Sequence, residues 1–196
     1  MKLPSKQSVA GFTIIELLVI MVIVAVLAGI AAPGWLGFLN RQRLNSAQAE
    51  AVSAIREAQS RAKLQKRTWA ACFQDTTTGV RWAVNPVPTN NPAWNCTNAS
   101  NWQNLIRSDA DKIQIDAGLS RRIEPPTLPA NFFEVRFQDK GWVSVLGQQV
   151  DNSQALGKIT FRAKDSPQGS RRCVYVATLL GAIRTANDAE CNNNTN

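Results

Sequence analysis

The chain has 196 residues, of which 22 are Lys or Arg and 14 are Asp or Glu, so its formal net charge is +8 at neutral pH. It contains four cysteines and no histidine, which excludes both Ser-His-Asp and Cys-His catalytic arrangements. No glycine-rich phosphate loop follows a predicted strand either, and we expect neither an enzyme nor a bound cofactor.

An apolar run of 19 residues, 14–32, follows a short basic leader and carries a single charge, Glu16. As a helix this run spans about 28 Å, close to the hydrocarbon thickness of a bilayer. Lys2 and Lys6 precede it without an acid, which puts the N-terminus in the cytoplasm and the rest of the chain on the other side. A carboxylate inside such a run is costly, so we expect Glu16 to have a function and a partner charge.

A conventional secretory signal is the alternative interpretation of this segment. Its apolar region would be residues 17–27, and the small-x-small pattern Gly29-Ile30-Ala31 offers a cleavage site. Glu16 at the head of the apolar region, and a run longer than the usual 7–15 or so residues, favour a helix that stays in the membrane.

The stretch Gly11-Phe12-Thr13-Ile14-Ile15-Glu16-Leu17-Leu18 resembles the class III signal of type IV pilins and type II secretion pseudopilins. The resemblance implies that a prepilin peptidase cuts after Gly11 and methylates the new amino terminus of Phe12. It also implies that Glu16 pairs with the terminal amine of a neighbouring subunit, since two opposite charges buried together cost less than either alone. Pro33 matches the helix-breaking proline of this family.

Beyond the membrane segment, the helix is predicted to continue as an amphipathic stretch. Apolar residues at spacings of three and four share one helical face: Leu44, Ala47, Ala51, Ile55, Ala58 and Ala62. The small alanines would let this face lie close against a sheet.

A polar stripe runs along the same stretch and comprises Arg56, Gln59, Lys63, Lys66 and Arg67. It could contact phosphates or lipid headgroups. A solvated surface or a contact between subunits is the other interpretation.

After residue 68 the apolar pattern changes from helical to alternating. The predicted strands are 69–73, 80–84, 112–116, 132–137, 142–146, 158–163, 173–178 and 182–185. A long N-terminal helix followed by short strands predicts an α+β fold with an antiparallel sheet packed on the helix. The resemblance adds that this is the type IV pilin fold, with its transmembrane part in the first half of the helix.

Residues 85–104 are rich in Asn, Pro, Thr and Trp and predict an irregular surface loop. Trp94 and Trp102 in this loop could stack on sugars or bases. They could equally anchor the loop to the sheet, which is the interpretation that we favour.

The four cysteines, Cys72, Cys96, Cys173 and Cys191, contain no C-x-x-C pair, so a zinc site is not expected. An exported domain lies in an oxidising space, where disulfides form. Three pairings are possible. We favour Cys72 with Cys96 and Cys173 with Cys191, because each closes a short segment.

Three aspartates, Asp109, Asp111 and Asp116, are the best candidates for a calcium site. Their spacing lacks the glycine and the terminal glutamate of an EF-hand loop. We therefore predict no metal.

Two C-terminal stretches, 158–161 and 172–184, together with the helix-to-strand junction at 67–72, resemble the GspH/FimT branch of minor pilins and minor pseudopilins. FimT-type proteins of this branch bind DNA through a Gly-Arg-x-Arg motif. Here the matching residues are Gly181-Ala182-Ile183-Arg184, so Arg184 matches and the first arginine is absent. Arg171 and Arg172 on the preceding strand are candidates for the missing charge, and they would make salt-sensitive phosphate contacts.

Together these features predict a removed leader at 1–11, a transmembrane helix at 12–35, its amphipathic continuation at 36–67 and a β-rich head at 68–196. The resemblance implies a minor pilin or pseudopilin of a type IV pilus or a type II secretion system, at or near the filament tip. Its partners would be other pilins or pseudopilins, the prepilin peptidase and the inner-membrane assembly platform. The alternative is a DNA-binding minor pilin that acts in DNA uptake. In either case we expect a single-pass inner-membrane protein with a periplasmic head.

Overall fold

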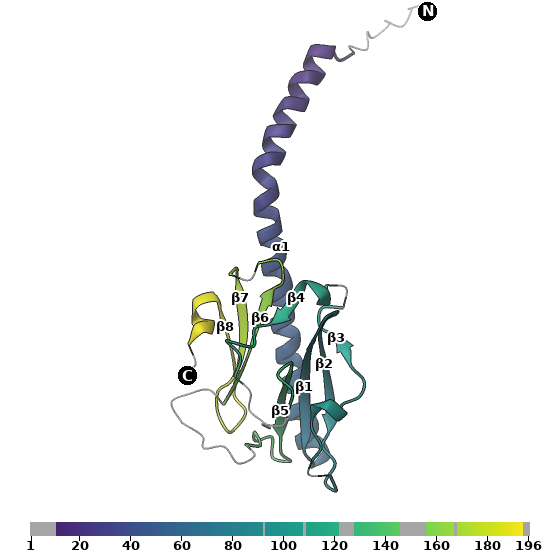
Figure 1. The fold of residues 1–196 in the computed structure, drawn as a ribbon, viewed down its shortest axis with the longest axis vertical. Coiled ribbons are helices and arrows are strands. Elements are labelled where there is room, and N and C mark those ends of the chain that lie inside the picture. Colours follow the sequence, from purple (N-terminus) through teal and green to yellow (C-terminus); the bar gives the residue numbers. More distant parts are fainter. Residues whose placement is uncertain are drawn as a thin grey trace, which may run out of the picture. The chain divides into compact units, whose positions relative to one another are not determined.

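A computed structural model describes residues 11–91, 93–107, 109–121, 128–145, 156–166 and 168–193 (Figure 1). The chain forms two compact units, Met1–Leu39 and Asn40–Asn196. Helix α1, Ile14–Gln65, supplies residues to both. It ends where Lys66 takes a positive φ of 52°, a left-handed conformation that is common just past a helix C-terminus.

In the first unit, every residue of α1 whose side chain is described is exposed except Leu39, which is half-buried. Most of these side chains are large and apolar. No single helix among the described residues meets the length and hydropathy expected of a membrane span. Two helical segments that are bent relative to each other, Ile14–Ile30 and Gly34–Gln65, together meet both the length and the hydropathy.

In the second unit, α1 packs its small apolar face into the core. The six residues predicted to form this face are each at most 1% exposed, which confirms the helical spacing. They share one core with apolar residues from the strands, including Phe73, Phe137 and Phe161. Because four of the six are alanines, the strands lie close to the helix axis. The compact unit therefore includes residues 40–67 as well as the predicted head.

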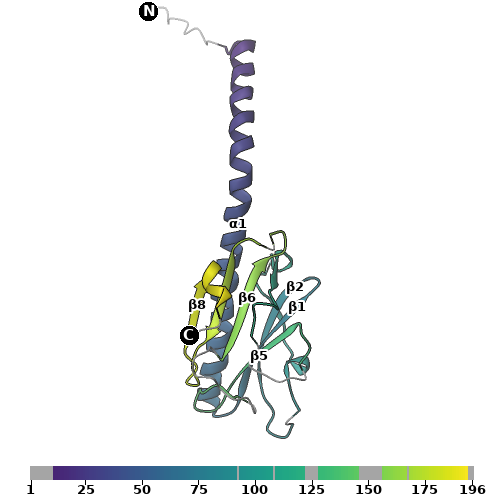
Figure 2. The same ribbon diagram turned by 60° about the vertical axis from the view of Figure 1, so that its left-hand side comes forward.

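Among the described residues, eight strands form two antiparallel sheets beside this part of α1 (Figures 1 and 2). The first sheet has the order β3-β2-β1-β5, with bounds Gln103–Asn104, Gly79–Pro86, Trp69–Thr76 and Phe132–Phe137. The second has the order β4-β6-β7-β8, with bounds Ile113–Ile115, Gly157–Ala163, Arg171–Val176 and Ile183–Asn187. Three short 3-10 helices complete the described part: η1 Cys96–Asn98, η2 Ala110–Lys112 and η3 Asp188–Asn192.

Seven of the eight predicted strands are present, with bounds shifted by up to three residues. The strand predicted at 142–146 is wrong in its described part, because Val143 makes only an isolated bridge to Phe137. Residue 146 lies outside the described residues. The two-residue strand β3 was not predicted, since two exposed polar residues show no alternation.

The prediction of a single sheet is also wrong. The described strands divide into two sheets of four strands each. Asp75 joins the two sheets here: its Oδ2 accepts a 2.9 Å hydrogen bond from Ile115 N of β4. The α+β class with antiparallel strands packed on a long helix is confirmed.

Candidate functional site

The N-terminal motif lies at the start of α1. Gly11, Phe12 and Thr13 precede the helix, and Phe12 is 75% exposed. Thr13 Oγ1 accepts a 3.3 Å hydrogen bond from Glu16 N, which is the bond made by an N-cap residue. A Cβ added at Gly11 would meet nothing within 4 Å. The Gly11–Phe12 peptide bond is therefore open to an enzyme, and Glu16 lies in the first helical turn.

Pro33 lies within α1, which is assigned as helical on both sides of it. The two segments of the bent pair meet at residues 31–33. Pro33 thus lies at the bend. That this proline breaks the helix remains a prediction.

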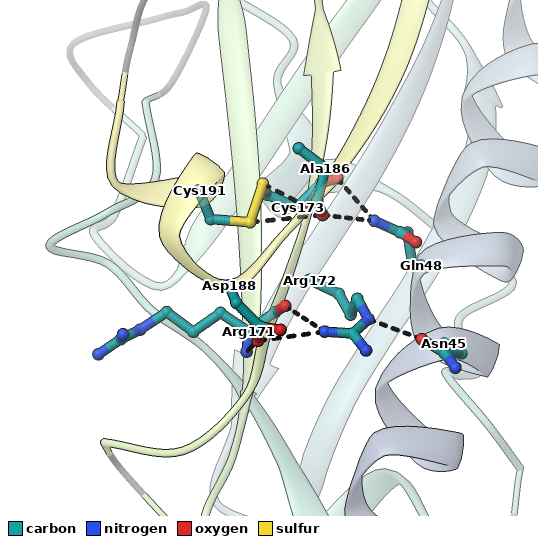
Figure 3. A network of polar contacts seen from close by, with 8 residues as sticks. All are labelled: Asn45, Gln48, Arg171, Arg172, Cys173, Ala186, Asp188 and Cys191. Carbon is teal, nitrogen blue, oxygen red and sulfur yellow. Dashed lines mark hydrogen bonds and ion pairs between the residues drawn. A yellow bond between two sulfur atoms is a disulfide. The ribbon is translucent and has the colours of Figure 1, made fainter.

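In the head, Arg172 is bound to the long helix and to the C-terminal segment (Figure 3). Its Nε donates a 2.6 Å hydrogen bond to Asn45 Oδ1, and its Nη1 lies 3.2 Å from Asp188 Oδ1. The residue is only 8% exposed. The guanidinium is therefore used inside the head and is not presented to solvent.

Arg171 and Arg184 lie in different surroundings from Arg172. Arg171 Nε is 3.6 Å from Asp116 Oδ2, which also lies 3.7 Å from Arg162 Nε. Arg184 is exposed on β8, opposite Tyr175 of β7. The three arginines predicted to contact DNA thus do not form one open cluster, and only Arg184 faces solvent without an ion pair among the described residues.

The cysteines pair as predicted. Cys173–Cys191 ties η3 to β7, with its Cα atoms 5.8 Å apart. Gln48 of α1 supports the same place, because its Nε2 donates 2.9 Å hydrogen bonds to the carbonyls of Cys173 and Ala186 (Figure 3). The helix, β7 and η3 are therefore connected by one disulfide and several polar bonds.

A buried lysine, Lys158, completes this C-terminal arrangement. Its Nζ donates to the carbonyls of Cys191 at 2.8 Å and Asn193 at 3.3 Å, and it lies 5.7 Å from the centroid of the Tyr175 ring. Burial lowers the pKa of Lys158 below its ordinary value, and burial raises the pKa of Tyr175. Tyr175 Oη donates to Glu190 O at 2.7 Å, so both side chains hold the end of the described chain.

The second disulfide, Cys72–Cys96, fixes the Trp-bearing loop to β1. Trp94 is 7% exposed, and its carbonyl accepts a 2.6 Å hydrogen bond from Arg136 Nη2. Trp102 Nε1 donates to Ala99 O at 3.0 Å. Its ring also contacts Phe132 of β5, with the two ring centroids 6.1 Å apart. Both tryptophans therefore anchor the loop, which is the interpretation that we favoured.

A buried ion pair lies beneath this loop. Arg136 Nε donates to Glu134 Oε1, and Glu134 Oε2 accepts a 2.9 Å hydrogen bond from Cys96 N. Burial raises the pKa of Glu134 above its ordinary value. The carboxylate holds η1 against β5, which is a structural role.

The three candidate calcium aspartates are not brought together. Asp109 pairs with Arg43 at 3.1 Å, Asp111 with Lys112 at 3.0 Å, and Asp116 with Arg162 and Arg171. Among the described residues, no group of three His, Cys, Asp or Glu side chains could hold a metal ion.

The sequence pattern assigns Gln59 to a polar surface, but the structure shows it bonded inside the head. Gln59, assigned to the polar stripe, points its Nε2 at the carbonyls of Gly141, Leu180 and Gly181, at 3.0, 3.3 and 3.4 Å. Asn45, Gln48 and Lys158 were not singled out at all. In the sequence, a single polar residue gives no signal of a hydrogen bond to a segment that lies far away along the chain.

Comparison with known proteins identifies the N-terminal segment. Residues 6–32 match the family described as "Prokaryotic N-terminal methylation motif". The chain therefore carries this motif at the start of its long helix, joined to an α+β head. No curated protein matches the chain significantly.

Two solved structures resemble the fold at low sequence identity. One is the minor pseudopilin EpsH of the type 2 secretion system of Vibrio cholerae, at 14% identity and a TM-score of 0.43, covering 72% of this chain and 96% of that one. Another is the type IV minor pilin FimU of Pseudomonas aeruginosa, at 14% identity and a TM-score of 0.41, covering 76% of this chain and 92% of that one.

Proposed function

We propose that this chain is a minor pilin or pseudopilin, a structural subunit of a filament assembled from the inner membrane. The observation that carries the proposal is an exposed Gly11–Phe12 segment joined to a helix whose described apolar side chains are exposed from Ile14 to Ile30 and from Trp35 to Phe38. Such a surface needs lipid around it before assembly and other apolar helices around it afterwards. Processing at Gly11 by a prepilin peptidase would leave Phe12 as the methylated terminus.

In this proposal Glu16 pairs with the amine of Phe12 of the subunit beside it. The N-terminus before cleavage lies in the cytoplasm and the head in the periplasm, as the basic leader indicates. The position at or near the filament tip rests on the resemblance of residues 158–161 and 172–184 to the GspH/FimT branch. The assembly platform of the inner membrane is the machine that would extract the subunit.

The test uses the full chain in its native host. The mature protein should begin at Phe12 with one added methyl group, whereas a secretory signal would leave a start near Ala32. Glu16→Ala should leave the amount in the membrane fraction unchanged and remove the protein from sheared filaments. Asp165→Ala, at an exposed position of the head, is the control and should be incorporated normally. Unchanged incorporation of the Glu16 variant would contradict the proposal. The tip position is tested separately, by immunogold labelling of filaments.

A further inference from the structure

Three exposed apolar side chains gather on two turns of the head: Trp142, Leu179 and Leu180, which are 48%, 45% and 68% exposed. We call them the turn patch. One turn runs from Gln138 to Trp142, where Gln138 N donates to Trp142 O at 2.8 Å. The other contains Leu179 and Leu180, and Val143 N donates to Leu179 O at 2.8 Å. Within the described head, Leu64 is the one other large apolar side chain with comparable exposure.

The backbone beneath the turn patch is held by hydrogen bonds to α1. Gln59 Nε2 lies between the carbonyls of Gly141, Leu180 and Gly181 and so connects both turns to α1. Gly141 and Gly181 have φ of 78° and 79°, a region that favours glycine. A preformed apolar surface loses little conformational entropy on binding. Its exposure therefore marks a place for a partner rather than a loosely folded loop.

The charges around the turn patch are mainly positive. The Lys63 side chain lies against Gly141, and Lys140 Nζ is 5.4 Å from the centroid of the Trp142 ring. Arg67 lies over Trp69, the strand neighbour of Phe137, just before the first turn. Asp139 in that turn offsets one of these cations. No ion pair involves Lys63 or Lys140 in the part of the head that the structure describes.

The head's own carboxylates are largely committed to internal partners. Glu57 pairs with Arg61, Asp109 with Arg43, Asp116 with Arg162 and Arg171, and Asp188 with Arg172. A second copy docked face to face would set Lys63 and Lys140 against their own copies, and like charges at an interface are costly. A lipid surface is also a poor fit, because recognition of anionic lipids uses clusters of about 4–8 basic residues, more than surround this patch.

From these observations we propose that the turn patch docks a different protein subunit, one with an apolar centre and acidic side chains at its edge. Trp142, Leu179 and Leu180 contact the apolar centre, while Lys63 and Lys140 face the carboxylates. If the chain is a filament subunit, this surface selects which other subunit follows it. The docking surface lies in the head, so it does not depend on Glu16 or on processing at Gly11.

The test places the photoreactive residue p-benzoylphenylalanine at Trp142 or at Leu180 of the full chain in its native host, with Thr185 on exposed β8 as the control position. Both patch positions should give an adduct with the same polypeptide, and the cross-linked peptide should combine apolar residues with Asp or Glu. The paired changes Lys63→Glu and Lys140→Glu should lower the yield about tenfold, because two attractive contacts become repulsive. Arg184→Glu, which reverses one exposed charge elsewhere, should leave the yield unchanged.

Several outcomes would overturn the proposal. They are an adduct of two copies of this chain, an adduct of lipid mass, an equal yield at Thr185, and a yield insensitive to the lysine reversals. The milder pair Lys63→Gln and Lys140→Gln separates misfolding from lost recognition: it should give an intermediate yield while protease resistance and both disulfides stay as in the parent. Loss of filament incorporation with Glu16→Ala and a retained cross-link would show that docking at the turn patch is separate from assembly.

Discussion

Arg172 of β7 connects the long helix to the C-terminal segment, through a 2.6 Å hydrogen bond from its Nε to Asn45 Oδ1. Its Nη1 also contacts Asp188 Oδ1 at 3.2 Å. A charged side chain that is 8% exposed and has partners on two elements contributes to folding, and its removal leaves those partners unsatisfied.

We therefore expect Arg172→Gln to lower the free energy of unfolding of the head by about 1–2 kcal/mol. The matched control is Arg184→Gln, which removes an exposed arginine and should change stability by less than about 0.5 kcal/mol. Urea denaturation of the head from Asn40 onward, with the parent head as reference, measures both. Equal effects of the two substitutions would contradict the internal role assigned to Arg172.

The C-terminal disulfide should stabilise the head by restricting its unfolded chain. Cys173 and Cys191 are 18 residues apart, so replacing both by Ser should cost about 3 kcal/mol. The Ser pair at Cys72 and Cys96, 24 residues apart, should cost slightly more on the same model. Hydrogen exchange distinguishes the two variants. Loss of Cys173–Cys191 should speed amide exchange in η3, and loss of Cys72–Cys96 should speed it in η1. Fast exchange in both segments for either variant would contradict this assignment.

The sequence pattern predicts the helix face well for a physical reason. Core positions on a helix repeat at a fixed spacing, so Leu44, Ala47 and Ala51 reveal the buried side without any knowledge of the sheet. Disulfide pairing follows similarly from short separation along the chain. The N-terminal motif is local too, since its residues lie together at the start of the helix.

What the sequence does not predict depends on residues far apart in the chain. Gln59 and Arg172 look like ordinary polar surface residues until the turns at Gly141 and Gly181, or the side chain of Asp188, lie beside them. The division into two sheets depends on which strands pair with one another, and the sequence of a single strand does not show its neighbours. The turn patch is of the same kind, because its two turns are 37 residues apart between Trp142 and Leu179.

Gly181 should tolerate no side chain. Its φ is 79°, and a Cβ there would lie 2.4 Å from Gln59 Nε2 and 2.9 Å from the Phe137 ring. We expect Gly181→Ala to destabilise the head by about 1–3 kcal/mol, through backbone strain and through displacement of Gln59. Gly118→Ala is the control, because its Cβ would meet only Asp116 Oδ1 at an ordinary 3.6 Å. Thermal unfolding of the two variants should differ clearly, and a neutral Gly181→Ala would contradict the close approach of α1 to this turn.

The carboxyl group of Asp75 should make stability depend on pH in an unusual direction. Burial raises its pKa above the ordinary 3.8, although the hydrogen bond from Ile115 N and the charges of Lys164 and Arg162 oppose the shift. The folded state therefore holds this proton more tightly than the unfolded state, so the contribution of Asp75 to stability is lost as pH rises from 3.8 through the folded pKa.

Asp75→Asn removes this titration while keeping an oxygen that can accept the bond from Ile115 N. The difference in unfolding free energy, variant minus parent, should therefore increase as pH is raised from the acid side to neutrality. Asp111→Asn is a control of opposite sign, because the hydrogen bond with Lys112 lowers the pKa of Asp111 and its contribution is lost as pH falls. Urea denaturation of the three proteins across the acid range measures both slopes. A difference for Asp75→Asn that stays flat or decreases with rising pH would show that the ion contacts of Lys164 and Arg162 outweigh its burial.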